Sequence, residues 1–250
     1  MKSPDYNFAM PDLLNIKTKP SMFCPGCGES IILKHLGIVL KDNHLQNKTT
    51  FIIDIGCALL SWNYFNLDTL QSHHGRSVPV AVGYKTIREN RNVIAFMGDG
   101  GAYAIGLQSL LHAAFRNNPI TVIIVNNTDY AMTGGQMAPT TLSNEITTTS
   151  VSGKDPKEVG PAFHGPELVR QIADKNAFIA RASISNPALL DTMLKKAFKT
   201  QSENNFSMVE VLSICPTNWK TNAAESFDFL AKMEKVYPVG EIIQNEKPSK

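Results

Sequence analysis

Two patterns of apolar residues alternate along most of the chain. Short, predominantly apolar runs are typical of strands buried on both faces, and they occupy residues 51–55, 93–97, 120–125, 177–182 and 206–212. Apolar residues at helical spacing occur at residues 31–40, 78–87, 104–115, 166–176, 187–202 and 227–235. This alternation of strands with helices predicts the α/β class, with a mostly parallel sheet covered by helices on both faces.

The length and composition favour one folded unit. The chain has 250 residues, of which 43% are hydrophobic, so we expect a single domain over residues 1–250. Residues 1–20 contain three prolines and little periodicity, which indicates an N-terminal arm. Residues 217–250 are polar apart from one short helix, and we expect them to form a C-terminal extension.

The charge pattern argues against several kinds of partner. The formal charge is +2, with 24 basic and 22 acidic residues scattered along the chain, so we expect no nucleic acid partner. No apolar run approaches the ~20 residues that span a bilayer. Residues 1–5 are not followed by an apolar run of the kind found in signal peptides. We therefore expect no membrane association and a cytoplasmic location.

The turn at residues 98–101, Gly-Asp-Gly-Gly, lies between a predicted strand and a predicted helix. Unpaired backbone N–H groups and the helix dipole make such a turn an anion site, and glycines let a phosphate approach closely. A carboxylate would repel that phosphate, so Asp99 indicates a divalent metal such as Mg²⁺ between them. Asn127, after the next strand, lies within reach of the same metal. By itself, a glycine and aspartate turn is also common in loops that bind nothing.

The spacing of this turn makes it more specific. Gly98-Asp99-Gly100 is followed by 25 residues and then by Asn126-Asn127. This arrangement resembles the Gly-Asp-Gly and Asn-Asn signature of enzymes that bind thiamine diphosphate through Mg²⁺, and it implies the thiamine-diphosphate-binding fold. The resemblance implies three metal ligands, namely the side chains of Asp99 and Asn127 and the backbone carbonyl of Asp129. The glycines expected against the diphosphate are Gly98, Gly100 and Gly101.

Four cysteines form a second set of candidate ligands: Cys24, Cys27, Cys57 and Cys215. Each lies in a predicted turn or at a strand end. In a cytoplasmic protein such a set indicates metal binding rather than disulfides. Four thiolates can hold a tetrahedral Zn²⁺ or a [4Fe–4S] cluster, and spacing alone does not separate the two. Four unrelated buried thiols are a third interpretation.

Right-handed crossovers between parallel strands would bring the two sets together. The ends of the predicted strands then lie along one edge of the sheet, which is where open α/β sheets keep their ligands. The residues expected at this edge are Cys57, Gly98, Asn127 and Cys215.

Seven motifs, in this order, are similar to those of the β subunit of the 2-oxoacid:ferredoxin oxidoreductases. They are Cys-Pro-Gly-Cys-Gly-Glu from Cys24, Ile-Gly-Cys ending at Cys57, His-Gly-Arg from His74, Gly-Asp-Gly-Gly from Gly98, Asn-Asn from Asn126, Tyr-Ala-Met-Thr-Gly-Gly-Gln from Tyr130, and Cys-Pro-Thr from Cys215. The resemblance covers residues 24–240 and implies that the four cysteines bind one [4Fe–4S] cluster close to the thiamine. The chain has no run of closely spaced cysteines, so further clusters would belong to a different subunit.

The resemblance also implies an activity. It is the oxidative decarboxylation of a 2-oxoacid to an acyl-CoA and CO₂, with coenzyme A as acyl acceptor and ferredoxin as electron acceptor. Residues 126–139 and 215–219 are more similar to subunits assigned to branched-chain substrates such as 2-oxoisovalerate, and 2-oxoglutarate is the other candidate. The direction of the reaction in the cell is not defined by these residues.

Partner subunits follow from the same resemblance. Thiamine activation needs a glutamate against the pyrimidine ring, and in this superfamily the glutamate lies on a second domain. We expect an α subunit to supply that pyrimidine-side domain, and the family leaves room for γ or δ subunits. The chain alone is therefore expected to be inactive.

Other residues are assigned by their place in the motifs. We expect His74 and Arg76 to contact the diphosphate or the substrate carboxylate, although a turn held by a structural Arg76 salt bridge would explain them equally well. Thr133 and Gln136 belong to a turn that lies beside the cofactor in the family. Gly56, before Cys57, is assigned to the same cofactor site.

Two features are interpreted as structural. The threonine-rich loop, residues 140–150, is expected to be a solvated connector rather than part of a site. Met97 and Met132 are expected to be packing residues.

Alternative functions use only part of these features. A non-oxidative thiamine-dependent decarboxylase subunit with a structural zinc site would need Asp99 and Asn127 but no redox cluster. A non-catalytic electron-transfer subunit would need the cysteines but not the thiamine turn, and the same is true of a zinc-stabilised subunit without catalysis. Only the oxidoreductase uses both sets of residues.

Overall fold

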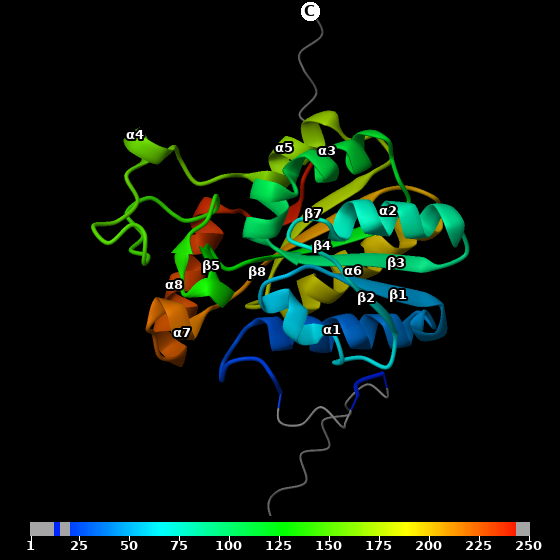
Figure 1. Ribbon diagram of the computed structural model, residues 1–250, viewed down its shortest axis with the longest axis horizontal. Coiled ribbons are helices and arrows are strands. Elements are labelled where there is room, and N and C mark those ends of the chain that lie inside the picture. Colours follow the sequence, from blue (N-terminus) through cyan, green and yellow to red (C-terminus); the bar gives the residue numbers. More distant parts are fainter. Residues whose placement is uncertain (1–12, 16–20, 244–250) are drawn as a thin grey trace, which may run out of the picture.

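Seven strands form the central sheet of the computed structural model, which describes residues 13–15 and 21–243 (Figure 1). Their order across the sheet is β2-β1-β3-β4-β8-β7-β9, and every neighbouring pair is parallel except β7 with β9. The mostly parallel sheet is thus confirmed. The strands are β1 (Thr49–Ile53), β2 (Asp68–Gln71), β3 (Asn92–Gly98), β4 (Thr121–Asn126), β7 (Phe178–Ser183), β8 (Ser207–Leu212) and β9 (Gly240–Glu241).

Both faces of the sheet carry apolar side chains, because successive residues of a strand point to opposite faces. In β3, Ile94 and Phe96 pack on one face, and Ala95 and Met97 pack on the other. Helices α1 and α6 cover the first face, and α2, α3 and α5 cover the second (Figure 1). Helices on both faces are therefore confirmed. Their bounds are α1 (Glu29–Asp42), α2 (Ser77–Ile87), α3 (Leu107–Phe115), α5 (Gly165–Ile172) and α6 (Pro187–Ser202).

Several short elements were not predicted from the apolar pattern. The edge strand β2 was missed because its side chains are polar and mostly exposed. None of the helices within the described residues combines the length and the apolarity needed to cross a bilayer. The other short elements are β5 (Asp129–Tyr130), β6 (Gln136–Met137), α4 (Pro156–Val159), α7 (Pro216–Trp219) and single helical turns at Gln46–Lys48, Cys57–Ser61 and Ala131–Thr133.

The helix after the Gly-Asp-Gly turn begins differently from the prediction. A π-helical turn, Gly101–Ile105, comes first, and the N–H of Gly106 donates to the carbonyl of Gly101 at 2.8 Å. Gly106 lies so close to Gly75 that a Cβ on Gly106 would be 2.9 Å from the Gly75 carbonyl oxygen. This close approach ties the turn after β3 to the turn that carries His74.

The C-terminal segment is more ordered than its polar sequence indicated. Helix α8 (Ala223–Val236) begins at a capping box formed by Asn222 and Glu225. After it, Tyr237 is fully buried and β9 pairs with β7. Most of the predicted N-terminal arm and residues 244–250 lie outside the described residues.

Candidate functional site

The turns after β1, β3, β4 and β8 meet at one edge of the sheet, because these strands are parallel neighbours. These four turns carry the two candidate ligand sets, so their predicted convergence is confirmed. The residues brought to this edge are Cys57, Gly98, Asn127 and Cys215.

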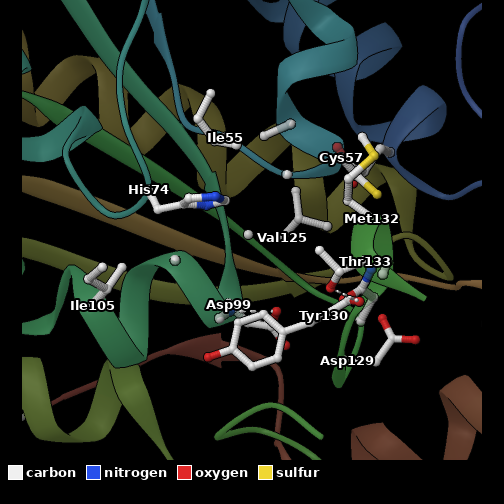
Figure 2. A pocket seen from close by; sticks show the side chains of 18 residues that line it. Ile55, Cys57, His74, Asp99, Ile105, Val125, Asp129, Tyr130, Met132 and Thr133 are labelled. Atoms are coloured by element: carbon white, nitrogen blue, oxygen red, sulfur yellow. Dashed lines mark hydrogen bonds between the residues drawn. The ribbon is translucent and has the colours of Figure 1, made fainter. Parts of the chain in front are cut away.

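A cavity of about 390 Å³ opens at this edge. Figure 2 shows His74 and Ile105 on one side of the cavity and Cys57 and Met132 on the other. Arg76, Gln136 and the other three cysteines are not among its lining residues. The lining residues that the sequence had indicated as site residues are Gly56, Cys57, His74, Gly98, Asp99, Gly100, Gly101, Asn127, Asp129 and Thr133.

Asp99 lies at the end of β3 with only 2% of its surface exposed. One carboxylate oxygen accepts a hydrogen bond from the N–H of Gly100 at 2.7 Å, and the other accepts one from the hydroxyl of Thr140. Burial raises the pKa of Asp99 to about 7, although the hydrogen bonds from Thr140 and Gly100 oppose this shift. A divalent cation at this carboxyl would favour its ionised form.

The turn after β4 carries two of the predicted metal ligands. Asn127 is buried and lines the cavity. Asp129 is also buried, and one of its carboxylate oxygens has no hydrogen-bond partner. Burial, followed by the negative charge of Asp99, raises the pKa of Asp129 to about 8. The sequence assigned only the backbone of Asp129 to the site, whereas its carboxyl, with one oxygen unpaired, also lines the cavity.

Glycines leave room at the cavity wall. A Cβ added at Gly98 or at Gly56 would meet no atom within 4 Å, so both positions face open space. Gly101 has the opposite role, because a Cβ there would come within 2.2 Å of a carboxylate oxygen of Asp54. The wall is therefore open where a bulky ligand would approach it and closed where the turns pack together.

The turn before α2 is positioned by a carboxylate that the sequence did not single out. Asp54 is fully buried, and both of its oxygens accept the N–H of Gly75, at 2.8 and 3.0 Å. The same turn presents His74 to the cavity. Arg76 is exposed at the start of α2, so the structure brings only one of these two predicted residues to the cavity.

Thr133 and Gln136 contact each other at the rim. The Thr133 hydroxyl donates to the Gln136 side-chain oxygen at 2.6 Å, and the Gln136 amide donates back to the Thr133 carbonyl at 2.8 Å. Only Thr133 lines the cavity. Met132 also lines it and is 46% exposed, so its interpretation as a packing residue was wrong, whereas that of the buried Met97 is confirmed.

The four cysteines are free thiols, and three chain segments hold them near one another. The N–H of Gly28 donates to the carbonyl of Ile214 at 3.2 Å, which joins the Cys24–Cys27 turn to the segment that carries Cys215. The pKa of Cys27 is raised to about 12, first by burial and then by the charge of Glu29, with smaller contributions from the charges of Cys215 and Cys24. The pKa values of Cys57 and Cys215 are raised as well, first by burial and then partly by neighbouring thiols. A positively charged metal centre would be needed to stabilise these thiolates.

No group of three or more His, Cys, Asp or Glu side chains within residues 13–15 and 21–243 is arranged to hold a single metal ion. A tetrahedral Zn²⁺ would require all its thiolates within bonding distance of one atom, whereas a [4Fe–4S] cluster binds each cysteine through a different iron. Within the described residues, the four thiols are thus not placed around one metal ion.

Glu29 is a cavity residue that the sequence reasoning missed. It is 3% exposed, one of its carboxylate oxygens has no hydrogen-bond partner, and burial with the charge of Asp99 raises its pKa to about 8. Its signal was its place two residues after Cys27, on the first turn of α1. Tyr130, which also lines the cavity, was missed as well. Its ring packs closely over Gly100, and a Cβ added at Gly100 would lie 2.2 Å from a ring carbon of Tyr130.

The threonine-rich loop is the largest departure from the prediction. Thr140 and Thr141 are fully buried, and Thr140 donates to Asp99. Interpretation of the loop as a solvated connector was therefore wrong. The contact between Thr140 and Asp99 joins residues 41 positions apart in the sequence, and a local sequence pattern does not predict such a contact.

Comparison with known proteins gives the class of the domain. Residues 54–211 match the family described as "Thiamine pyrophosphate enzyme, C-terminal TPP binding domain". The matched range runs from the end of β1 to β8 and includes the turns of Asp99 and Asn127. The domain is thus a thiamine-diphosphate-binding domain by its fold and sequence.

Individual relatives narrow the class. The chain is 37% identical over 222 residues to the ketoisovalerate oxidoreductase subunit VorA of Methanothermobacter thermautotrophicus, which is 87% of this chain and 46% of that subunit. It is 34% identical over 214 residues to the 2-oxoglutarate synthase subunit KorB of Archaeoglobus fulgidus, which is 86% of this chain and 77% of that subunit. The chain thus spans about half the length of the VorA subunits it matches.

A solved structure shares the fold. The 2-oxoglutarate:ferredoxin oxidoreductase from Magnetococcus marinus, with 2-oxoglutarate, coenzyme A and succinyl-CoA bound, superposes with a TM-score of 0.79 at 22% identity. The alignment covers 95% of this chain and 85% of that chain. The chain described here belongs to the family of thiamine-diphosphate-binding subunits of 2-oxoacid:ferredoxin oxidoreductases.

Proposed function

We propose that this chain binds thiamine diphosphate through Mg²⁺ together with one [4Fe–4S] cluster, and that with a partner subunit it oxidises a 2-oxoacid to an acyl-CoA, with ferredoxin as electron acceptor. The observation that carries this proposal is the position of Cys57. Cys57 lines the cavity, and it is also close enough to Cys27 and Cys215 for their charges to raise its pKa. A cluster held there would lie beside the cofactor, as electron transfer between them requires.

The residues around the cavity fit the cofactor. Asp99, Asn127 and the carbonyl of Asp129 would hold Mg²⁺, because carboxylate and carbonyl oxygens are the ligands this ion prefers. The open space at Gly98 suits the diphosphate, and the unpaired carboxylate oxygen of the buried Asp129 suits a nearby cation. Cys24, Cys27, Cys57 and Cys215 would hold the cluster.

Bound thiamine diphosphate supplies an electron sink for decarboxylation, and a [4Fe–4S] cluster accepts electrons one at a time. The residues of this chain have other tasks. Gly56 and Gly98 leave space at the cavity wall, and Asp99 with Asn127 would hold the Mg²⁺ that orients the diphosphate. His74 lines the cavity and could donate a hydrogen bond to the substrate carboxylate. Arg76 does not line it, so Arg76 would contact the substrate only if the partner subunit placed the substrate near it.

A branched-chain 2-oxoacid fits the cavity better than 2-oxoglutarate. Ile55, Ile105, Val125 and Met132 line it, and no Lys or Arg is among its lining residues in the described part of the chain. A second carboxylate on the substrate would need a positive partner. We therefore expect a higher kcat/KM with 2-oxoisovalerate than with 2-oxoglutarate.

The test is the composition of the anaerobically purified complex of this chain with its partner subunit. We expect about four iron and four sulfide per copy of this chain, beyond those of other subunits, together with one thiamine. Cys57→Ser should reduce the iron content and the electron paramagnetic resonance signal of this cluster while thiamine is retained. Ser202→Ala on the exposed surface of α6 is the control and should change neither cofactor.

Each alternative has its own outcome. Zinc instead of iron with thiamine retained would contradict the oxidoreductase and indicate a non-oxidative decarboxylase. Iron without thiamine would indicate an electron-transfer subunit. Turnover by this chain alone, after reconstitution with both cofactors, would contradict the need for a partner.

A further inference from the structure

The threonine-rich loop (residues 140–150) contacts both turns that carry the predicted Mg²⁺ ligands. On one side, the Thr140 hydroxyl donates to the Asp99 oxygen that Gly100 leaves free. On the other side, the hydroxyl of Thr141 donates to the carbonyl of Thr128, which lies between Asn127 and Asp129. Each contact comes from a fully buried threonine.

The turn between the predicted ligands is strained. Thr128 has a φ of 62°, and it is the single β-branched residue among the non-glycine residues with positive φ in the described part of the chain. Such a conformation costs about 1–3 kcal/mol and persists only where surrounding contacts hold it. Here the Thr128 hydroxyl donates to a Glu145 carboxylate oxygen at 2.6 Å and to the carbonyl of Asn127 at 2.8 Å.

The loop is itself held from the side away from the cavity. The ammonium group of Lys154, which is 3% exposed, donates to the carbonyl of Thr141 at 2.8 Å. The hydroxyl of Tyr237 donates to the carbonyl of Thr140 at 2.6 Å. The second Glu145 oxygen accepts the N–H of Leu142 at 2.7 Å. The donors that reach the ligand turns are therefore held in place by other contacts within the protein.

We propose that this loop is the positioning shell of the Mg²⁺ site: Thr140 orients the Asp99 carboxylate, and Thr141 with Glu145 holds Thr128 so that Asn127 and Asp129 face the same ion. The inference rests on the proposed function, since it concerns the same cofactor site. Partners that orient a metal ligand typically contribute 10-fold to 100-fold to metal affinity. Thr140 is thus a positioning residue that does not itself touch the metal.

The test compares Thr140→Val, which keeps the volume but removes the hydroxyl, with Thr140→Ser, which keeps the hydroxyl. Both are made in the complex with the partner subunit, and the apparent dissociation constant of Mg²⁺ is measured at a fixed thiamine diphosphate concentration by calorimetry. We expect Thr140→Val to weaken Mg²⁺ binding by about 10-fold to 100-fold, and Thr140→Ser to stay within about threefold of the wild type. Thr192→Val on α6 is the matched control and should have no effect.

Thr128→Gly separates positioning from folding. Glycine adopts a positive φ without strain, so this variant should fold at least as stably, yet it should bind Mg²⁺ several-fold more weakly because the contact with Glu145 is lost. Substitution of Mn²⁺ for Mg²⁺ gives a second readout, since its electron paramagnetic resonance spectrum should broaden in Thr140→Val and Thr128→Gly if the ligands are less ordered.

The outcomes separate this inference from the proposed function. A wild-type complex that binds thiamine diphosphate without any dependence on a divalent ion would contradict the proposed site. A wild-type complex with Mg²⁺-dependent binding, together with Thr140→Val and Thr128→Gly variants of unchanged affinity, would overturn the positioning role alone.

Discussion

Two groups of buried carboxyls in this protein have opposite surroundings. Glu210 on β8 is fully buried, but Arg181 on the neighbouring strand donates to it at 2.6 Å and donates twice to Glu167 at 2.7 Å. At the cavity, Glu29 and Asp129 each have an oxygen without a hydrogen-bond partner. The first group is complete within the protein and supports the fold, whereas the second needs a cation or ligand from outside.

The pKa values express the same difference. Those of Glu29, Asp99 and Asp129 are raised, in each case first by burial. That of Glu167 is lowered overall, because hydrogen bonds from Arg181 and its charge outweigh the effect of burial. The buried acids at the cavity thus keep raised pKa values, whereas pairing with Arg181 lowers the pKa of Glu167, which is partly exposed.

Removing the charge at the cavity should have the largest effect on activity. Asp99→Asn takes away a predicted metal ligand, and the loss of several kcal/mol of metal-dependent stabilisation corresponds to a loss of roughly 100-fold to 1000-fold in turnover. The melting temperature of the cofactor-free complex should not fall, because the variant removes a buried acid whose pKa is raised by burial. Asp228→Asn on exposed α8 is the control. Undiminished Mg²⁺-dependent thiamine binding in Asp99→Asn would contradict this assignment.

Breaking the complete group should have the largest effect on stability. Arg181→Met leaves Glu210 buried without its cation, which should destabilise the fold by about 3–5 kcal/mol and lower the melting temperature by roughly 6–20 °C. Lys196→Met provides a matched control, because its 3.1 Å pair with Glu241 is exposed and should contribute less than about 1 kcal/mol. The double change Arg181→Met with Glu210→Leu should recover part of the loss. Equal melting temperatures for Arg181→Met and Lys196→Met would show that the buried pair is not needed.

A smaller effect is expected where the two regions join. Tyr237→Phe removes the hydroxyl that donates to the Thr140 carbonyl, and one such hydrogen bond contributes about 0.5–1.5 kcal/mol. We expect a modest fall in melting temperature and a small loss of Mg²⁺ affinity. A fall as large as that of Arg181→Met would mean that Tyr237 supports the fold in some way beyond this contact.

The smallest expected effect concerns pH. Because the pKa of Glu167 is lower in the folded state than its ordinary value of 4.5, its stabilising contribution is present above that value and is lost as the pH falls through the folded pKa. The melting temperature of Glu167→Gln should therefore lie below that of the wild type at pH 6, and the two should converge as the pH falls below 4.5 and through the folded pKa. A constant difference over this range would argue against a charged Glu167 in the folded state.

The sequence predicted the frame of the site because the frame depends on local patterns. The uninterrupted apolar runs of β3 and β4 are needed in a sheet that is covered on both faces, and the glycines after β3 are needed where a turn must stay open. Right-handed crossovers place the ends of the parallel strands along one edge of the sheet. These features are sufficient to bring Asp99, Asn127 and Cys57 to one edge of the sheet.

Other parts could not be predicted from local patterns. Arg181 lies within an apolar run, and nothing near it in the sequence indicates that Glu210 and Glu167 neutralise it. Thr140 lies in a loop of polar residues that would be equally typical of an exposed connector. Both depend on pairing between segments that are distant in the sequence.

The sequence by itself therefore determined the class of fold, the edge of the sheet where ligands gather and the residues that could hold two cofactors, since periodicity and motif spacing report local geometry. The tertiary structure alone decided which buried acids are compensated and which are not. It also decided that His74 lines the cavity while Arg76 does not, and that a threonine-rich loop contacts the turns of the predicted metal ligands. The physical reason is that hydrogen bonding and electrostatic compensation are set by distances in space, which the spacing of residues along a chain does not specify.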